Sequence, residues 1–204
     1  MEYVFIILVL LFSVIIHEVA HGTVAYYLGD PTAKYAGRLS LNPLKHLDPI
    51  GSLLLPLLLI VIRSPILFGY AKPVPINPYN FRDRKYGTLK VALAGPASNF
   101  SIAVFFGILI RVFSLPINSG LGLMFSFIVW INLLLAVFNL VPIPPLDGSH
   151  ILFAILPDSM WELKTALRQF GIFILFFIIF FFYPWIALII RWLFLIITGS
   201  SFSI

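Results

Sequence analysis

The sequence predicts an all-α polytopic membrane protein, and composition and hydropathy carry that prediction. Hydrophobic residues make up 61% of the 204 residues and charged residues only 10%, and the mean hydropathy is +1.06. A soluble globular domain has about a quarter of its residues charged, so this chain belongs in a bilayer. The net charge of +5 therefore reports the orientation of loops in the membrane rather than binding to nucleic acid.

We expect about five to six membrane segments in a single domain, 1–204. Long apolar runs predict transmembrane helices at about 3–28, 88–113, 121–141, 169–183 and 185–198. Pro184 separates the last two as a tight turn, because proline cannot continue an ordinary helix. The apolar run 50–62 is too short, at about 1.5 Å per residue, to cross a hydrocarbon core of about 30 Å. We expect it to form a short re-entrant helix or a buried half-span.

Two polar connections bear on how these segments are arranged. Residues 34–42, KYAGRLSLN, have roughly alternating polarity and contain a glycine, which predicts a short strand or β-hairpin. The stretch 63–90 carries six basic residues and one acidic residue, so the positive-inside rule places it in the cytoplasm. If 50–62 is re-entrant, the first helix runs from outside to inside; if it spans, that helix runs the other way.

A cluster of ionisable residues interrupts the first apolar helix, in the sequence HEVAH, residues 17–21. Such groups are costly in hydrocarbon and mark functional sites. Residues four apart share a helix face, so His17 and His21 can bind one metal ion. Glu18 lies about 100° around the helix and can reach a water at the metal without ligating. This HExxH pattern is typical of zinc proteases; the alternative is a pair of histidines that hydrogen-bond between helices.

A catalytic zinc usually has three protein ligands and one open position. The chain has no cysteine, so the third ligand must be an acid or another histidine. Asp147 is the only acidic residue between 88 and 156, and the prolines just before it interrupt the helix. Unwound backbone at membrane depth is tolerated where it lines a cavity, and Gly148 allows a close approach of the chain. Asp147 is the predicted third ligand, with the capping of a turn as its alternative role.

Two motifs together resemble those of the site-2 protease family of intramembrane zinc metalloproteases. They are HEVAHG, residues 17–22, and NLVPIPPLDG, residues 139–148. The stretches LNPLKHLDPIG, AKPVP and AGPASN resemble the small single-domain bacterial and archaeal branch, which has no PDZ or CBS domain. The resemblance covers a motif-bearing core of about residues 1–160, whereas the helices within 169–198 carry no family motif.

The resemblance also implies roles for individual residues. It implies a catalytic Glu18 and one Zn²⁺ ion per chain, bound by His17, His21 and Asp147. Asn139, at the head of the second motif, is expected to hold the substrate or the developing oxyanion. Asn99, which ends AGPASN, is a second candidate for that role. Each asparagine has a structural alternative, since Asn139 can end a helix and Asn99 can bond between helices.

The implied function is that of a zinc metalloendopeptidase that hydrolyses a peptide bond in or near a transmembrane helix of a membrane-protein substrate. Its active site is expected in the inner half of the cytoplasmic membrane, and a homo-oligomer is compatible with the sequence. The substrate must unwind, so we expect it to be held by the strand edge within 34–42 or by the loop AKPVPINP, 71–78. The alternatives are a metal transporter, whose ligands tend to repeat across inverted halves, and a non-catalytic scaffold that binds helices.

Overall fold

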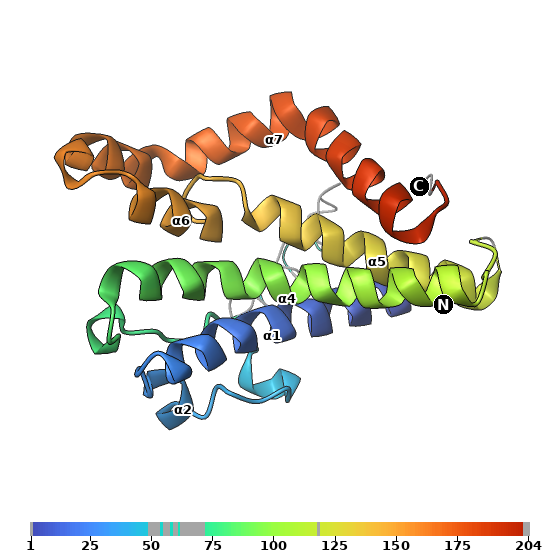
Figure 1. Ribbon diagram of the computed structural model, residues 1–204, viewed down its shortest axis with the longest axis horizontal. Helices are drawn as coiled ribbons and strands as arrows, with labels where there is room; N and C mark the ends of the chain where they lie inside the picture. The colour runs from blue at the N-terminus through green and yellow to red at the C-terminus, as the bar shows by residue number, and fades with distance from the viewer. Residues whose placement is uncertain are drawn as a thin grey trace.

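The computed structural model describes residues 2–48, 54, 58, 61, 72–117 and 119–201. These residues contain no strand and are organised as helices (Figure 1). The long helices are α1 (Glu2–Tyr27), α4 (Arg84–Val112), α5 (Gly120–Asn139) and α7 (Trp161–Thr198). The short elements are α2 (Thr32–Tyr35), α6 (Asp147–Ile155) and the 3-10 helices η1 (Pro43–Lys45), η3 (Pro78–Asn80) and η4 (Asp158–Met160).

Four helical stretches of the described residues are long and apolar enough to cross a membrane: Val4–Tyr27, Tyr86–Val112, Gly120–Asn139 and Asp158–Thr198. The predicted all-helical character is therefore confirmed, and the helices expected at 3–28, 88–113 and 121–141 correspond to α1, α4 and α5. Apart from residues 54, 58 and 61, the re-entrant helix predicted at 50–62 lies outside the described residues. The total of five to six segments consequently stays a prediction.

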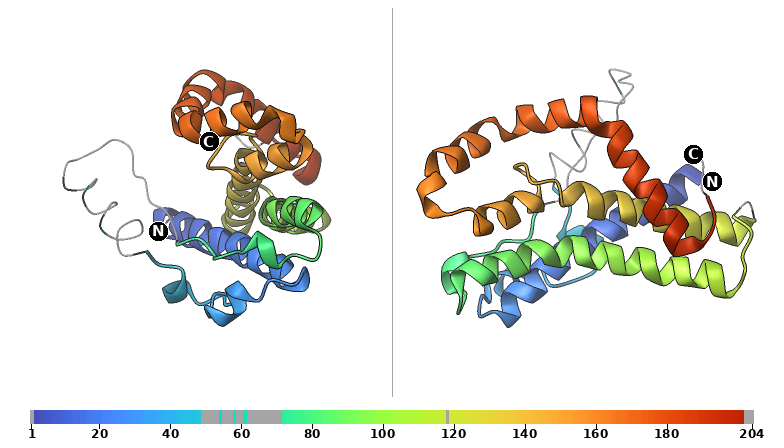
Figure 2. Two further views of the ribbon diagram at one scale, coloured as in Figure 1. Left: turned by 90° about the vertical axis from the view of Figure 1, so that its left-hand side faces the viewer. Right: turned by 45° about the horizontal axis from the view of Figure 1, so that its top comes forward.

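α1, α4 and α5 lie side by side, and α7 packs across α4 and α5 (Figures 1 and 2). Buried apolar side chains of α4, α5 and α7 form the main core: Ala103, Ile110, Val129, Leu133, Ile190 and Phe194. Gly107 permits the close approach of α4 and α7, because a Cβ at this position would overlap the side chain of Ile197. Both chain termini lie at one end of the molecule, and the end of α1 and the starts of α4 and α7 lie toward the other (Figure 1).

The tight turn predicted at Pro184 is wrong, because Pro184 lies inside the continuous helix α7. A proline within a helix removes one backbone hydrogen bond and kinks the helix without having to end it. α7 bends near its middle, and its first half stands away from α5 (Figure 1). The two segments expected at 169–183 and 185–198 are thus one bent helix.

The strand or hairpin predicted at 34–42 is also wrong for these residues. α2 ends inside this stretch, and Gly37 follows it with a positive φ of 65°. Gly37 N donates to Lys34 O and Arg38 N donates to Ala33 O, each at 2.9 Å. This pair of bonds is the Schellman motif that ends helices at a left-handed glycine. The glycine therefore marks a helix end, and the alternating polarity beyond it pairs with no strand among the described residues.

Candidate metal centre and active-site cleft

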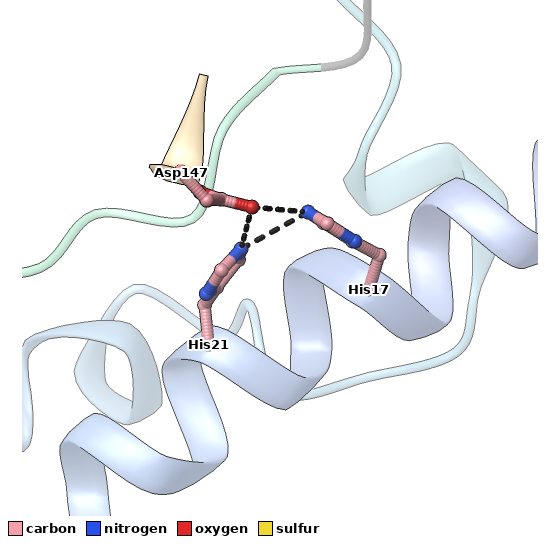
Figure 3. A group of neighbouring side chains, drawn as sticks. All are labelled: His17, His21 and Asp147. Carbon is pink, nitrogen blue, oxygen red and sulfur yellow. Dashed lines mark hydrogen bonds and ion pairs between the residues drawn. The ribbon is translucent and has the colours of Figure 1, made fainter. Parts of the chain in front are cut away.

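Three side chains from two distant parts of the chain meet at one point (Figure 3). α1 presents His17 and His21 on one face, with their Nε2 atoms 3.1 Å apart. Asp147 Oδ2 lies 3.0 Å from His17 Nε2 and 3.2 Å from His21 Nε2. Both histidines are buried, and the three ligand atoms could hold one metal ion. The structure thus brings together the three predicted ligands, 130 residues apart in sequence.

The hydrogen bonds of the two rings fix where their lone pairs point. His17 Nδ1 lies 2.6 Å from Asn99 Oδ1, and His21 Nδ1 lies 2.7 Å from the carbonyl oxygen of Val91. Because an oxygen acceptor requires a donor opposite it, each neutral imidazole carries its proton on Nδ1 and a lone pair on Nε2. Apart from its contacts with these two rings, the buried Oδ2 atom of Asp147 has no hydrogen-bond partner among the described residues. The lone pairs of His17 Nε2, His21 Nε2 and Asp147 Oδ2 therefore point toward one another without a hydrogen atom between them. Such a set of three electron-pair donors is suited to binding a cation.

Asp147 reaches this point because α6 begins at it, directly after the proline-rich turn that follows α5. The same turn needs Gly148, since a Cβ there would overlap the carbonyl oxygens of Leu140 and Val141. The sequence predicts that Gly148 lets the chain approach the metal site closely. In the structure the close approach is instead to the backbone that ends α5, and this packing directs Asp147 toward α1.

Glu18 lies beside the three ligands and faces a cleft. Its Oε2 accepts a hydrogen bond of 2.9 Å from the backbone N–H of Val74. The cleft has a volume of about 380 Å³ and is lined by α1, α4, the segment 73–81 and the start of α6, including Glu18, His21, Val74, Val91, Asp147 and His150. A carboxylate and a convergent ligand set thus open onto one cleft large enough for several residues of a peptide chain.

Comparison with known proteins places the chain in a family. The family model of Peptidase family M50 matches residues 114–182. "Putative zinc metalloprotease YwhC" of Bacillus subtilis is 37% identical over 183 residues, which are 86% of this chain and 80% of that protein. "Putative zinc metalloprotease Rip2" of Mycobacterium tuberculosis is 33% identical over 189 residues, 90% of this chain and 70% of that protein. The chain belongs to peptidase family M50.

Membership in M50 confirms the site-2 protease resemblance of the two motifs. A third relative, "Putative zinc metalloprotease Rip2" of Mycolicibacterium smegmatis, is 34% identical over 162 residues, 79% of this chain and 61% of that protein. No solved structure matches the chain.

The structure separates the two asparagines that the sequence assigns to substrate or oxyanion binding in this M50 chain. Asn99 is fully buried between helices. Its Oδ1 faces His17, and its Nδ2 donates to Ser13 O at 3.2 Å and to Asn132 Oδ1 at 2.9 Å. All its polar atoms are thus occupied by the protein, which leaves no donor for a substrate oxygen and fits the alternative role between helices.

Asn139 occupies the last position of α5. Its Nδ2 donates to Leu135 O of the same helix at 2.9 Å, and it is not among the residues that line the cleft. An oxyanion role for Asn139 would require this amide to leave its own helix, so the geometry favours its helix-ending alternative.

Two further histidines lie apart from the ligands. His150 lines the cleft, one turn beyond Asp147 on α6. His46 is buried in the loop after α2, where its Nε2 lies 2.7 Å from Ser40 O. Neither belongs to the group of side chains that could hold the metal.

Gly95 of the AGPASN stretch is a functional position that sequence reasoning missed. A Cβ at this site would overlap the Nε2 atoms of both His17 and His21, so the two rings pack directly on the backbone of α4. A glycine inside a helix costs about 1 kcal/mol relative to alanine. That cost was the available signal that something must approach α4 closely at this point.

Proposed function

We propose that this M50 chain is an intramembrane zinc metalloendopeptidase that cuts a peptide bond in or near a transmembrane helix of a membrane protein. The observation that carries the proposal is the convergence of two lone-pair nitrogens and an unpartnered carboxylate oxygen beside Glu18, at the wall of a cleft. A set of His, His and Asp ligands suits zinc, and the relatives are named as zinc metalloproteases. One Zn²⁺ ion per chain would be held by His17, His21 and Asp147.

The chain's own groups can perform the proton transfers of hydrolysis. Zinc, when bound, supplies a Lewis acid that activates water and polarises the scissile carbonyl. The Glu18 carboxylate takes the proton of the attacking water and delivers it to the leaving amine, the work of a general acid–base group. Asn99 fixes the tautomer and the orientation of His17, so we assign it to positioning rather than to the oxyanion.

The cleft wall formed by residues 72–77 is the proposed guide for an extended substrate. This segment has no helical structure and runs past Glu18 through Val74. A substrate lying along it would present an unwound backbone to the centre, as in strand addition. The loop AKPVPINP thereby replaces 34–42 as the clamp we favour. Replacing residues 39–41 by a Gly/Ser spacer should then leave cleavage intact.

The depth of the centre supports cleavage within the membrane. His21 lies six residues before the end of α1 at Tyr27, which is about 9 Å along a helix with a rise of about 1.5 Å per residue. Basic residues gather beyond that end of the helix, which supports the cytoplasmic side. The proposed site therefore lies in the inner half of the cytoplasmic membrane, open to a lipid-embedded substrate.

The proposal is tested with purified protein in liposomes that contain a membrane substrate with a fluorogenic reporter. Glu18→Gln should bind zinc as the wild type does and cleave about a hundredfold to ten-thousandfold more slowly, since a general base contributes rate factors of that size. Glu162→Gln, on the exposed first turn of α7, is the matched control and should cleave normally. Cleavage that survives Glu18→Gln would refute the general-base role. Zinc binding by a wild type that cleaves nothing would favour the transporter or the scaffold.

A further inference from the structure

Asp30 is a fully buried carboxylate just beyond the end of α1. Its Oδ1 accepts from Thr32 N and from the Thr32 hydroxyl, which orders the start of α2. Burial alone would raise the pKa of Asp30, but these bonds and the donors of Asn77 and Asn80 together hold it below its usual value. A buried charge is stable only when it is this fully hydrogen-bonded.

Two of the donors to Asp30 come from a segment far along the chain. Asn77 N donates to Oδ2 at 2.7 Å, and Asn80 Nδ2 donates to Oδ1 at 2.8 Å. An aspartate that only capped α2 would need neither of them. The carboxylate therefore ties the end of α1 to the segment 72–82, which includes the cleft wall.

That segment is anchored along its whole described length. Lys72 N donates to His46 O at 2.9 Å, and Arg82 N donates to Leu28 O at 3.1 Å. Between these anchors Val74 donates its N–H to Glu18. The Val74 side chain is also seated against α1, because a Cβ on Gly22 would lie 2.8 Å from Val74 Cγ1. Val74 is thus the point where the wall contacts the proposed catalytic residue.

We propose that Asp30 is a positioning residue for Glu18, acting through residues 74–80; this rests on the proposed general-base role of Glu18. Pro73 and Pro75 flank Val74, and proline fixes its own φ and stiffens the residue before it. A displacement at Asn77 is therefore passed to Val74, three residues away, rather than absorbed between them. Asp30 holds the wall so that the Val74 N–H orients the Glu18 carboxylate.

The proposal requires a carboxylate rather than an amide at position 30. All four groups of the described residues that hydrogen-bond to Asp30 are donors: one N–H at Oδ2, and a backbone N–H, a hydroxyl and an amide at Oδ1. An asparagine at position 30 would direct its own NH₂ group, which is a donor, at the donors of either Oδ1 or Oδ2. The hydrogen bonds on that side would then be lost. Asp30→Asn thus changes the size of the side chain very little but removes the hydrogen bonds at one of its two terminal atoms.

The absence of cysteine gives a direct local readout. Val74→Cys places a single buried thiol on the wall, and Ala103→Cys, in a separate chain, places one in the core, since both side chains are nearly inaccessible. Asp30→Asn should speed thiol modification at position 74 at least tenfold and leave position 103 unreactive. In the chain without cysteine it should lower kcat between about tenfold and a hundredfold, the cost of misplacing a catalytic group by about 1 Å, with zinc affinity unchanged.

Two further variants serve as a matched control and as a milder disruption of the same hydrogen bonds. Asp83→Asn is the matched control, because Asp83 is an exposed N-cap that accepts from Tyr86 N and asparagine caps equally well. Asn80→Ala removes one donor and keeps Asp30. It should speed the labelling of position 74 and lower kcat, each by less than Asp30→Asn does. Unchanged labelling and turnover in both Asp30→Asn and Asn80→Ala would overturn the positioning role. The role would also be overturned if Asp30→Asn speeds the labelling of position 103 as much as that of position 74. A wild type that cleaves nothing would instead refute the proposed function.

Discussion

Each of the two imidazoles of the centre is oriented by a single hydrogen bond that it donates to an oxygen of α4. Asn99 faces His17, and the Val91 carbonyl faces His21. Groups that hold the second nitrogen of a ligating histidine fix its tautomer and typically change metal affinity about 10- to 100-fold when they are removed. Asn99 is itself held by Asn132, whose Nδ2 donates to Ser13 Oγ and to Ile128 O, each at 2.9 Å. The amide of Asn99 is therefore rigid, and its effect on His17 should be large.

Asn99→Leu should weaken zinc binding by about 10- to 100-fold, because the His17 Nδ1–H loses its acceptor and the ring loses its fixed orientation. The measurement is competition for zinc against a chromogenic chelator in detergent. Asn139→Leu is the matched control and should bind zinc as the wild type does, since among the described residues the Asn139 amide donates to Leu135 O of its own helix and not to the centre. Equal zinc affinity for Asn99→Leu and the wild type would contradict this assignment.

The meeting of the three proposed ligands could be predicted from sequence, whereas the groups that support them could not. The spacing of His17 and His21 follows from helix geometry, and Asp147 stands out because acids are rare in its apolar surroundings. The partner of His17 is 82 residues away and that of His21 is a backbone carbonyl 70 residues away. A backbone carbonyl carries no sequence signal, and the pairing of Asn99 with His17 depends on how α1 and α4 pack.

At the scale of elements, the errors of sequence reasoning come from two residue types with more than one use. Proline ends a helix where its surroundings favour a turn, as at 142–145, but Pro184 only bends α7, because apolar sequence continues on both sides. Glycine occurs in strands and also ends helices, and at Gly37 it does the latter. Helix existence was therefore predictable, while the choice between turn and kink required the packing of α7.

Gly107→Val should lower the stability of the fold, because its side chain would displace the Ile197 end of α7 from α4. Overpacking of this kind costs about 1 to 3 kcal/mol. The measurement is thermal unfolding in detergent micelles, with Gly120→Val as control, since a Cβ on Gly120 meets nothing within 4 Å. The zinc affinity should stay unchanged, because the contact lies away from His17 and His21. A Gly107→Val chain as stable as the control would argue against close packing of α4 and α7.

At the scale of the whole molecule, charge and fold give the same orientation. The basic residues beyond the C-terminal end of α1 and around the start of α4 include Lys34, Arg38, Lys45, Lys72, Arg82 and Lys90. The connection between α4 and α5, at the opposite end, carries no charge from 114 to 119. Both termini lie at the same end as this connection (Figure 1), where the last turn of α4 carries the basic residue Arg111. The positive-inside rule therefore predicts that the cleft faces the cytoplasm and that both termini lie outside, as the proposed function requires.

Single cysteines in this naturally cysteine-free chain test the orientation without interference from other thiols. Ser114→Cys, between α4 and α5, should react with a membrane-impermeant maleimide in intact cells. Asp158→Cys, in η4 before α7, should react only after the membrane is permeabilised, because it lies at the basic end. Both native side chains are exposed, so access to the reagent depends on the side of the membrane rather than on burial. The reverse labelling pattern would place the cleft on the outer side and would remove a cytoplasm-facing centre from the proposed function, while leaving the geometry of His17, His21 and Asp147 unaffected.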